Sequence, residues 1–334
     1  MLKVENLKVY YPSTQRLFAP RRFVRAVDGV SFELGNARTL GLVGESGCGK
    51  TTLGRAILGL SPVTEGSIFF EGQDIASLSR SELRKHRRKI QMIFQDPYSS
   101  LDPLMTIEQI LGEPLDIHRL YSNSTERREK ILSLMDWVGL DPSQAKRYPH
   151  EFSGGQRQRI GIARALALSP RMIVCDEPVS ALDVSIQAQI MNLLMDIQER
   201  EKISYLFISH DLALVQHACH RVAVMYLGRI VEEGSVEEIR SRPLHPYTQA
   251  LWNAIPTLEK ETLSGSLPLT GEIPSALNPP AGCHFHPRCP HAGEQCRRVY
   301  PTLSEFSSGH CVACHLHSPS EKPIPHENRT ANIN

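Results

Sequence analysis

The sequence lacks a secretion signal, an apolar segment long enough to cross a membrane, and an excess of charge of either sign. Its longest apolar runs, such as residues 222–227, are far shorter than the roughly 20 residues that span a bilayer. The chain opens with charged side chains at Lys3 and Glu5, whereas a signal peptide needs an uninterrupted apolar stretch. We therefore expect a cytosolic chain that contacts a membrane only through a partner.

The charge balance excludes a further class of protein. The chain has 37 basic and 36 acidic residues, whereas a general nucleic-acid-binding protein carries a basic excess. The basic run at residues 84–89 could contact nucleic acid or lipid headgroups, but such a run is more typical of a solvated helix face. With 41% hydrophobic and 22% charged residues, the composition is that of a globular protein, not of a disordered, collagen-like or coiled-coil chain. We expect no nucleic-acid partner.

Cysteine is scarce over most of the chain and abundant near its end. We expect Cys48, Cys175 and Cys219 to be core or loop residues. The other five of the eight follow close together: Cys283, Cys289, Cys296, Cys311 and Cys314. Because cytosolic thiols stay reduced, this clustering indicates a metal site more than disulfides.

Apolar patterns alternate between strand and helix along the chain. Apolar strands that alternate with helices predict an α/β fold with a parallel sheet covered on both faces. Three successive helical patterns without a strand indicate an inserted helical subdomain at about residues 100–168. A shift to Pro, Ser, His and Cys places a domain boundary near residue 258, followed by a Cys-rich extension (258–318) and a tail expected to be disordered (319–334). The predicted strands are 2–9, 27–34, 39–43, 66–70, 172–175 and 205–209, and the predicted helices are 107–118, 125–138, 154–168 and 186–197.

A glycine-rich segment between a strand and a helix fits the spacing G-x-x-x-x-G-K-[ST] of a phosphate-binding loop. In such a loop the backbone N–H groups point at phosphate oxygens, and the helix N-terminus adds partial positive charge. Lys50 would supply a full charge and Thr51 a hydroxyl for Mg²⁺. The alternative is an ordinary strand-to-helix glycine turn. The predicted ATP-binding residues here are Gly44, Ser46, Gly47, Cys48, Gly49, Lys50, Thr51 and Thr52.

Two adjacent carboxylates end the predicted strand at residues 172–175. Asp176 is suited to hold Mg²⁺, directly or through water, and Glu177 can accept a proton from an attacking water. Alone, such a pair often only marks the end of a strand. Together with the phosphate-binding loop, it predicts nucleotide hydrolysis with Glu177 as the general base.

The segment Ser153-Gly154-Gly155-Gln156-Arg157 resembles the signature sequence of ATP-binding-cassette (ABC) proteins. In that family two nucleotide domains close head to tail, and the signature serine and glycine amides of one domain touch the γ-phosphate bound by the other. The physical argument agrees, because Ser153 would open a second helix whose N-terminus attracts anions. The resemblance implies a P-loop NTPase nucleotide-binding domain over residues 1–257, with a parallel sheet core and an N-terminal antiparallel β subdomain.

Other positions follow from the same resemblance. Gln95 is similar to the Q-loop glutamine that touches Mg²⁺ and water, residues 180–183 to the D-loop, and His210 to the switch histidine that contacts the γ-phosphate. Tyr11 aligns with the aromatic residue that stacks on adenine, although Tyr10 lies beside it. The implied catalytic residues are Glu177, His210 and Gln95, and the implied Mg²⁺ ligands are Thr51, Gln95 and Asp176.

Three stretches, residues 44–50, 177–185 and 244–251, look like the dipeptide, oligopeptide and nickel importer family. The likeness extends to about Cys314, and the loop at 17–25 is closest to the second, F-type ATPase of peptide permeases. It implies a paralogous ATPase partner, two membrane-spanning permease subunits, an extracytoplasmic peptide-binding protein, and a place on the cytoplasmic face of the inner membrane. Nickel-transporting relatives usually lack so long a tail. A soluble ABC ATPase of DNA repair or translation is the rival hypothesis.

The cysteine-rich segment is too short and polar to fold by apolar burial alone, which favours a metal or a disulfide. Four thiolates could hold a [4Fe-4S] cluster or Zn²⁺, and free thiols or a disulfide are the third alternative. The resemblance implies a [4Fe-4S] cluster whose last ligand follows Val312-Ala313. The C-x₂-C spacing of Cys311 and Cys314 favours zinc, so the fourth ligand is open. The implied cluster ligands are Cys283, Cys289, Cys296 and Cys314.

Overall fold

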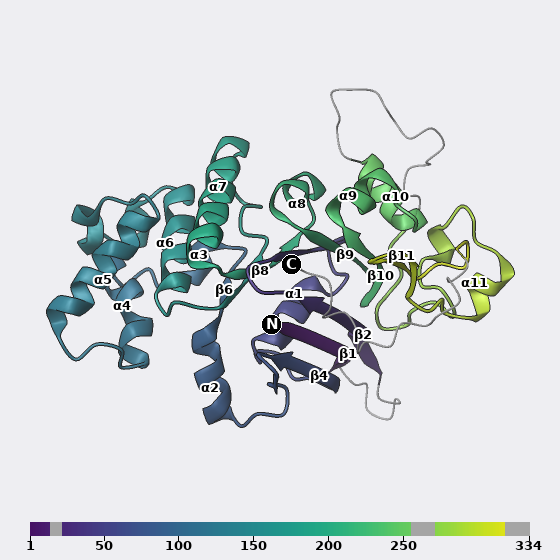
Figure 1. Ribbon diagram of the computed structural model, residues 1–334, viewed down its shortest axis with the longest axis horizontal. Coiled ribbons are helices and arrows are strands. Elements are labelled where there is room, and N and C mark those ends of the chain that lie inside the picture. The colour runs from purple at the N-terminus through teal and green to yellow at the C-terminus, as the bar shows by residue number, and fades with distance from the viewer. Residues whose placement is uncertain (14–21, 255–270, 318–334) are drawn as a thin grey trace.

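The computed structural model describes residues 1–13, 22–254 and 271–317 (Figure 1). Three predictions therefore fall wholly or partly outside the described residues: the loop at 17–25, the first part of the extension predicted from 258, and the tail at 319–334. In the part that is described, no helix is long and apolar enough to cross a membrane.

The parallel strands β3, β6, β7 and β8 are separated along the chain by helices, as the apolar pattern predicts. The strands are β1 (Leu2–Pro12), β2 (Phe23–Leu34), β3 (Thr39–Val43), β4 (Glu65–Phe70), β5 (Gln73–Asp74), β6 (Ile90–Ile93), β7 (Met172–Asp176), β8 (Ser204–Ser209), β9 (Arg221–Tyr226), β10 (Arg229–Ser235), β11 (Ser304–Ser307) and β12 (His310–Val312). The helices are α1 (Lys50–Ile57), α2 (Arg80–Lys89), α3 (Pro97–Ser100), α4 (Ile107–Ile117), α5 (Ser124–Trp137), α6 (Gly154–Leu166), α7 (Val184–Glu201), α8 (Leu212–Ala218), α9 (Val236–Ser241), α10 (Pro246–Asn253) and α11 (Glu294–Arg298), with 3-10 turns η1 (Pro142–Lys146), η2 (Pro149–Glu151) and η3 (His286–Arg288).

The central sheet has the order β11-β12-β10-β9-β3-β8-β7-β6 within the described residues. From β9 to β6 all neighbouring strands run parallel, which confirms the predicted parallel core. At the other edge β10 and β12 pair antiparallel, so the sheet as a whole is mixed. The prediction of a parallel sheet is therefore incomplete. The sequence pattern does not predict that β12 pairs with β10, because the paired residues are about 80 positions apart in the chain.

The parallel strands are buried on both faces, and their successive side chains enter two different hydrophobic clusters. In β8, Tyr205 and Phe207 pack with the helical segment and α7, whereas Leu206 and Ile208 pack with the N-terminal sheet and α1. The sheet is therefore held from both sides, and its strand ends have little freedom to move.

A second sheet, β2-β1-β4-β5, is antiparallel throughout and contains the N-terminus. Its inward residues share a cluster with α1 and with one face of the central strands. This is the antiparallel β subdomain that the family resemblance implied. Figure 1 shows α1 beside this sheet, below the central strands.

The predicted helical segment consists of α3 to α6, with η1 and η2 between them. Its helices begin at residues that cap exposed N–H groups: Thr106 and Gln109 form a capping box at α4, and Asn123 accepts from Thr125 at α5. In Figure 1, α4 and α5 form one end of the molecule.

The described part of the extension, residues 271–317, lies at the opposite end, around α11 (Figure 1). It joins the central sheet through β12, in which Val312 pairs with Glu232 and Cys311 with Glu233 of β10. The extension is thus attached to the cassette by backbone pairing as well as by side chains.

Candidate active site

The turn between β3 and α1 has a backbone that only glycine can adopt at two of its positions. Gly44 has φ 153° and Gly49 has φ 108°. A Cβ atom would lie 2.2 Å from the Met225 carbonyl oxygen at Gly44, and 2.0 Å from the Ala26 carbonyl oxygen at Gly49. These glycines therefore let the loop pass against neighbouring backbone, which explains the spacing seen in the sequence.

Lys50 is 4% exposed and folds back over this loop. Its Nζ donates to the carbonyl oxygens of Gly44 (2.7 Å) and Glu45 (3.0 Å). Both acceptors are neutral, and charge-assisted hydrogen bonds to phosphate oxygens are stronger than bonds to carbonyls. An anion that enters the loop can therefore replace these carbonyl oxygens as the hydrogen-bond acceptor of the Lys50 ammonium group.

The tip of the loop is its open side. Ser46 and Gly47 are exposed, and Thr51 and Thr52 are half-buried in the first turn of α1. Cys48 is instead buried, and burial raises the pKa of its thiol. Cys48 therefore supports the loop by packing, and its Sγ accepts from Lys50 Nζ at 3.7 Å.

Asp176 ends β7 beside the loop and is 3% exposed. Its Oδ1 accepts from the Thr51 hydroxyl at 3.0 Å. Burial raises the pKa of this carboxyl, while the Thr51 hydrogen bond and the positive charges of Arg55 and Lys50 oppose the rise. A buried carboxylate beside a hydroxyl is an all-oxygen donor set, which fits a hard cation such as Mg²⁺.

Glu177 follows with a left-handed backbone, φ 46°, which is uncommon for a residue with a side chain. Its N–H donates to the Ile208 carbonyl of β8 at 2.9 Å, which holds this conformation. Gln95 Nε2 donates to Glu177 Oε2 at 2.8 Å, and His210 Nδ1 lies 3.1 Å from Glu177 Oε1. The three residues predicted to be catalytic therefore form one cluster, although they follow three different strands.

The predicted signature residues lie at the start of α6. Ser153 Oγ accepts from the Gln156 N–H (3.3 Å), and Gln156 Oε1 accepts from the Ser153 N–H (2.9 Å). A Cβ on Gly155 would lie 2.6 Å from the Cγ2 atom of Ile186 in α7, so this turn packs closely against α7. The segment is positioned by the helical part of the chain and not by the phosphate-binding loop.

The two adjacent tyrosines have different partners. The Tyr10 hydroxyl donates to Asp28, and burial together with this bond raises the pKa of Tyr10 to about 12. The Tyr11 hydroxyl donates to Ser61 Oγ at 2.9 Å, and its ring is half-buried. Tyr10 is therefore bound to a buried carboxylate, whereas Tyr11 stays the predicted adenine contact.

Glu45 of the loop has partners that our sequence analysis missed. The hydroxyl of Tyr247 accepts from the Glu45 N–H at 2.8 Å, and Arg288 pairs with the Glu45 carboxylate through two nitrogens. Tyr247 lies in a stretch that the sequence analysis used only as a family marker. The sequence offers one hint of a role for Arg288, which is its place between the predicted metal ligands Cys283 and Cys289.

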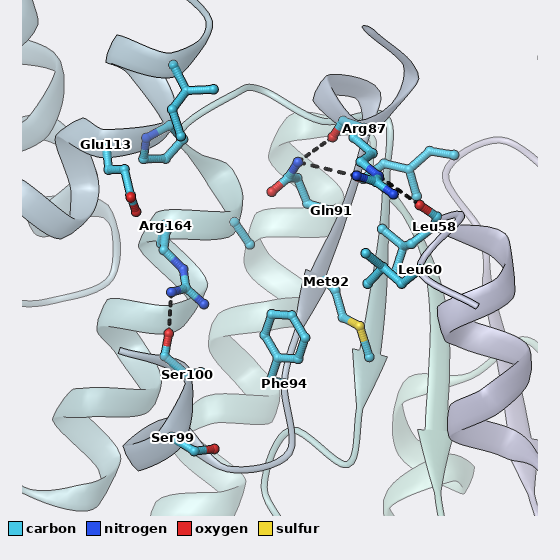
Figure 2. Close-up of a pocket in the computed structure, with 14 residues that line it drawn as sticks. Leu58, Leu60, Arg87, Gln91, Met92, Phe94, Ser99, Ser100, Glu113 and Arg164 are labelled. Atoms are coloured by element: carbon cyan, nitrogen blue, oxygen red, sulfur yellow. Dashed lines mark hydrogen bonds between the residues drawn. The ribbon is translucent and has the colours of Figure 1, made fainter. Parts of the chain in front are cut away.

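A cavity of about 510 Å³ lies between the helical segment and the end of α1 (Figure 2). On one side Arg87 donates to the carbonyl oxygens of Leu58 (3.0 Å) and Gly59 (2.8 Å). On the other side Arg164 donates to the Ser100 carbonyl oxygen. The cavity is therefore lined by the helical segment on one side and by the ends of α1 and α2 on the other, and β6, which leads to Gln95, runs along it.

The cysteines of the extension are near one another without forming an assembled metal site. Among residues 1–13, 22–254 and 271–317, no three Cys, His, Asp or Glu side chains are arranged to hold a metal ion. Burial, together with the nearby thiols of Cys283, Cys289 and Cys296, raises the pKa of Cys314 to about 11. Cys311 is buried in β12.

Comparison with known proteins identifies the class first. The ABC transporter family model matches residues 27–180. An ATP-binding cassette solved as a dimer in a post-hydrolysis state, bound to ADP and phosphate, superimposes with a TM-score of 0.64 and 29% identity, over 71% of this chain and 99% of that one. The chain is an ABC-type ATPase, with the α/β cassette fold that the sequence predicts.

The finer comparison concerns transport. The model described as the C-terminal region of oligopeptide/dipeptide transporters matches residues 231–296. The oligopeptide transport ATP-binding protein AppF of Bacillus subtilis is 53% identical over 95% of this chain and 98% of its own length. The dipeptide transport ATP-binding protein DppF of Escherichia coli is 48% identical over 97% and 96%. The chain belongs to the family of ATP-binding proteins of oligopeptide and dipeptide ABC transporters.

Replacing Asp176 by Asn tests the buried carboxylate. Because the pKa of Asp176 is raised, the folded protein holds this proton to a higher pH than the unfolded chain does, and the free energy of unfolding falls as the pH rises from about 3.9 to the raised value. Above that window we expect Asp176→Asn to be at least as stable as the parent protein in urea. We expect its affinity for Mg²⁺·ATP to fall about tenfold or more.

The control is Asp136→Asn, at an exposed position of α5. Unchanged Mg²⁺·ATP affinity in Asp176→Asn would contradict the assignment of this carboxylate.

Proposed function

We propose that this ATPase powers the import of di- or oligopeptides across the cytoplasmic membrane, as a peripheral subunit on the inner face. The full-length similarity to oligopeptide and dipeptide transport ATP-binding proteins supports this cargo. The cassette would comprise residues 1–257, with its helical subdomain at about 100–168, and the extension residues 258–318.

The observation that carries the proposed mechanism is the cluster of Glu177 with Gln95 and His210, next to Asp176. In the proposed reaction a water oxygen attacks the γ-phosphorus while Glu177 accepts a proton from that water, and ADP leaves. Gln95 positions the Glu177 carboxylate and the water. His210 is exposed, so it can turn from Glu177 towards the γ-phosphate.

The phosphates would lie in the loop formed by residues 44–49, with Lys50 and the first turn of α1 facing them. Thr51, Asp176 and Gln95 would hold Mg²⁺, which supplies positive charge against the β- and γ-phosphates when it is bound. Tyr11 would stack on the adenine ring. Asp176 fits this role because a buried, charged carboxylate needs a cation beside it.

The signature segment would act on the nucleotide of a second cassette. Ser153 to Gln156 open a helix whose N-terminus attracts anions. The related cassette solved with ADP and phosphate is a dimer, which supports a two-cassette arrangement. We propose that the partner is a paralogous ATPase subunit and that ATP bound at the shared interface closes the pair.

One of the two proposed permease subunits would dock at the cavity shown in Figure 2. Three large apolar side chains that line it are exposed: Leu60 (51%), Phe94 (36%) and Ile117 (49%). Exposed apolar groups beside the half-buried Arg87 and Arg164 suit a short amphipathic helix of another chain. Phe94 precedes Gln95, so movement there would reach Glu177. An extracytoplasmic peptide-binding protein would deliver the cargo through the permease.

We propose that the cysteines of the extension close around a [4Fe-4S] cluster, with Zn²⁺ as the alternative. The backbone supports convergence, because the Cys283 N–H donates to the Cys296 carbonyl at 2.8 Å. Cys283, Cys289 and Cys296 all lie near enough to Cys314 to raise its pKa, and this proximity supports the same four ligands. The bound group would be structural, since a segment of this size gains stability from a metal.

Glu177→Gln tests the mechanism. The variant keeps the shape of the side chain but cannot accept the proton, so we expect normal ATP binding and a fall in hydrolysis of about 10²- to 10⁴-fold. The measurement is phosphate release by the purified transporter. Glu199→Gln, exposed on α7, should hydrolyse ATP normally. Near-normal hydrolysis by Glu177→Gln would overturn the proposed general base.

Metal analysis of anaerobically purified protein tests the extension. We expect iron, acid-labile sulfide and visible absorbance that dithionite bleaches, or zinc without colour. Cys283→Ser and Cys314→Ser should lose the metal, whereas Cys311→Ala should retain it. Protein that contains neither iron nor zinc would contradict the proposal. If Cys311→Ala loses the metal and Cys314→Ser retains it, the fourth ligand is Cys311 and not Cys314.

Growth tests the cargo. A strain without this chain should fail to use defined dipeptides or longer peptides as its only nitrogen source, and should grow normally on free amino acids. The parent chain should restore growth and Glu177→Gln should not. Normal growth on all peptides, or purification of the chain without integral membrane subunits, would favour a soluble ABC ATPase instead.

A further inference from the structure

A side chain of the extension reaches the phosphate-binding loop. Arg288 lies between Cys283 and Cys289, and its two terminal nitrogens donate to Glu45 Oε2 (2.6 Å) and Oε1 (2.9 Å). The Arg288 side chain is only 4% exposed and that of Glu45 is 22% exposed. A bidentate, nearly buried pair of this kind defines both distance and angle between its partners.

A second contact holds the same loop residue. The Tyr247 hydroxyl accepts from the Glu45 N–H at 2.8 Å. The rings of Tyr247, Tyr226 and Phe285 pack together, with centroids 4.7 to 5.4 Å apart. Phe285 comes from the extension and is 2% exposed. The extension therefore packs directly against the Tyr247 ring, whose hydroxyl binds Glu45.

The start of α10, which carries Tyr247, is fixed by a buried carboxylate. Glu232 in β10 is 0% exposed and accepts from the N–H groups of Leu244 (2.7 Å) and His245 (2.9 Å). The ring of His310, from β12 of the extension, lies 2.8 Å from the same carboxylate. Cassette, α10 and extension therefore share one buried polar network.

These contacts converge on a residue that also touches the phosphate-binding lysine. Lys50 Nζ donates to the Glu45 carbonyl oxygen at 3.0 Å, while the N–H of Glu45 is bound to Tyr247 and its carboxylate to Arg288. A shift of Glu45 would therefore move an acceptor of Lys50 and the first backbone N–H groups of the loop.

We propose that Arg288 and Tyr247 are positioning residues for the phosphate-binding loop, so that the folded state of the cysteine segment sets the affinity of this subunit for nucleotide. The proposal rests on the proposed function, in which this loop binds ATP. It adds to that function a control of the loop by a segment more than 200 residues away in the sequence.

The test measures binding of a fluorescent ATP analogue to the full-length chain, and KM and kcat for ATP in the assembled transporter. Loss of loop positioning weakens ground-state binding, so it raises Kd and KM more than it changes kcat. We expect Arg288→Gln to raise both constants about tenfold, with kcat within about threefold of the parent. Arg288→Lys can keep one of the two contacts, so its Kd and KM should lie between those of the parent protein and those of Arg288→Gln.

A double-mutant cycle separates positioning from general damage. If Arg288 acts through Glu45, Glu45→Gln should weaken binding to a similar degree, and Arg288→Gln added to it should cause little further loss. Tyr247→Phe removes only the hydroxyl and should raise Kd without loss of the aromatic packing. If Arg288→Gln folds poorly, the Kd of Tyr247→Phe still tests whether the contacts of Glu45 position the loop.

Arg221→Gln is the matched control. Arg221 also joins cassette and extension, since it donates to Glu233 Oε1 and to the Gly309 carbonyl oxygen, both at 3.0 Å, but it does not contact the loop. It should bind ATP as the parent does.

Parent-like Kd in Arg288→Gln and Tyr247→Phe, full additivity with Glu45→Gln, or an equal loss in Arg221→Gln would each overturn the inference. Failure of the proposed nucleotide site is distinguishable, because the parent protein itself would then bind no ATP, like Lys50→Ala. Failure of the proposed cargo would show in the growth test and would leave ATP binding unchanged.

Discussion

Parallel strands end at one edge of their sheet, and the candidate active site depends on that constraint. The loop after β3, the carboxylates at the end of β7 and His210 after β8 all lie at the carboxyl ends of neighbouring strands. Because these strands are buried on both faces, their ends are held in fixed register: Val43 pairs with Ser209, and Asp176 with Ile208. The distances within the candidate site are therefore a consequence of sheet pairing, to which the loops add further hydrogen bonds.

This rigid edge carries two unfavourable features. Asp176 places a carboxylate in a buried position, where burial raises its pKa, and Glu177 adopts a left-handed backbone. Each is stabilised by a specific partner, Thr51 for Asp176 and the Ile208 carbonyl for the Glu177 backbone. Such strain and burial are found where a ligand completes the site. The positive charge of a bound Mg²⁺ would offset the negative charge of the Asp176 carboxylate.

The sequence predicts most of this site because its signals are local. The strands before the loop and before Asp176 are short apolar runs, and the loop spacing lies within eight residues, so pattern and position suffice. The contact of Gln95 and His210 with Glu177 follows once the strands are known to be parallel neighbours. The pairing of β12 with β10 does not follow, because β12 is short and its partner is chosen by contacts such as that of Glu232 with His310.

The pair of Arg288 and Glu45 is the extreme case, since 243 residues separate the partners. No periodicity or motif connects them, and each residue alone resembles an ordinary charged loop residue. In the folded chain the pair is nearly buried, and removing two charges from water costs free energy that only close, bidentate contact offsets. A pair of this kind adds little net stability, but it disfavours every other placement of either charge. That is the property required to hold the extension in one position against the phosphate-binding loop.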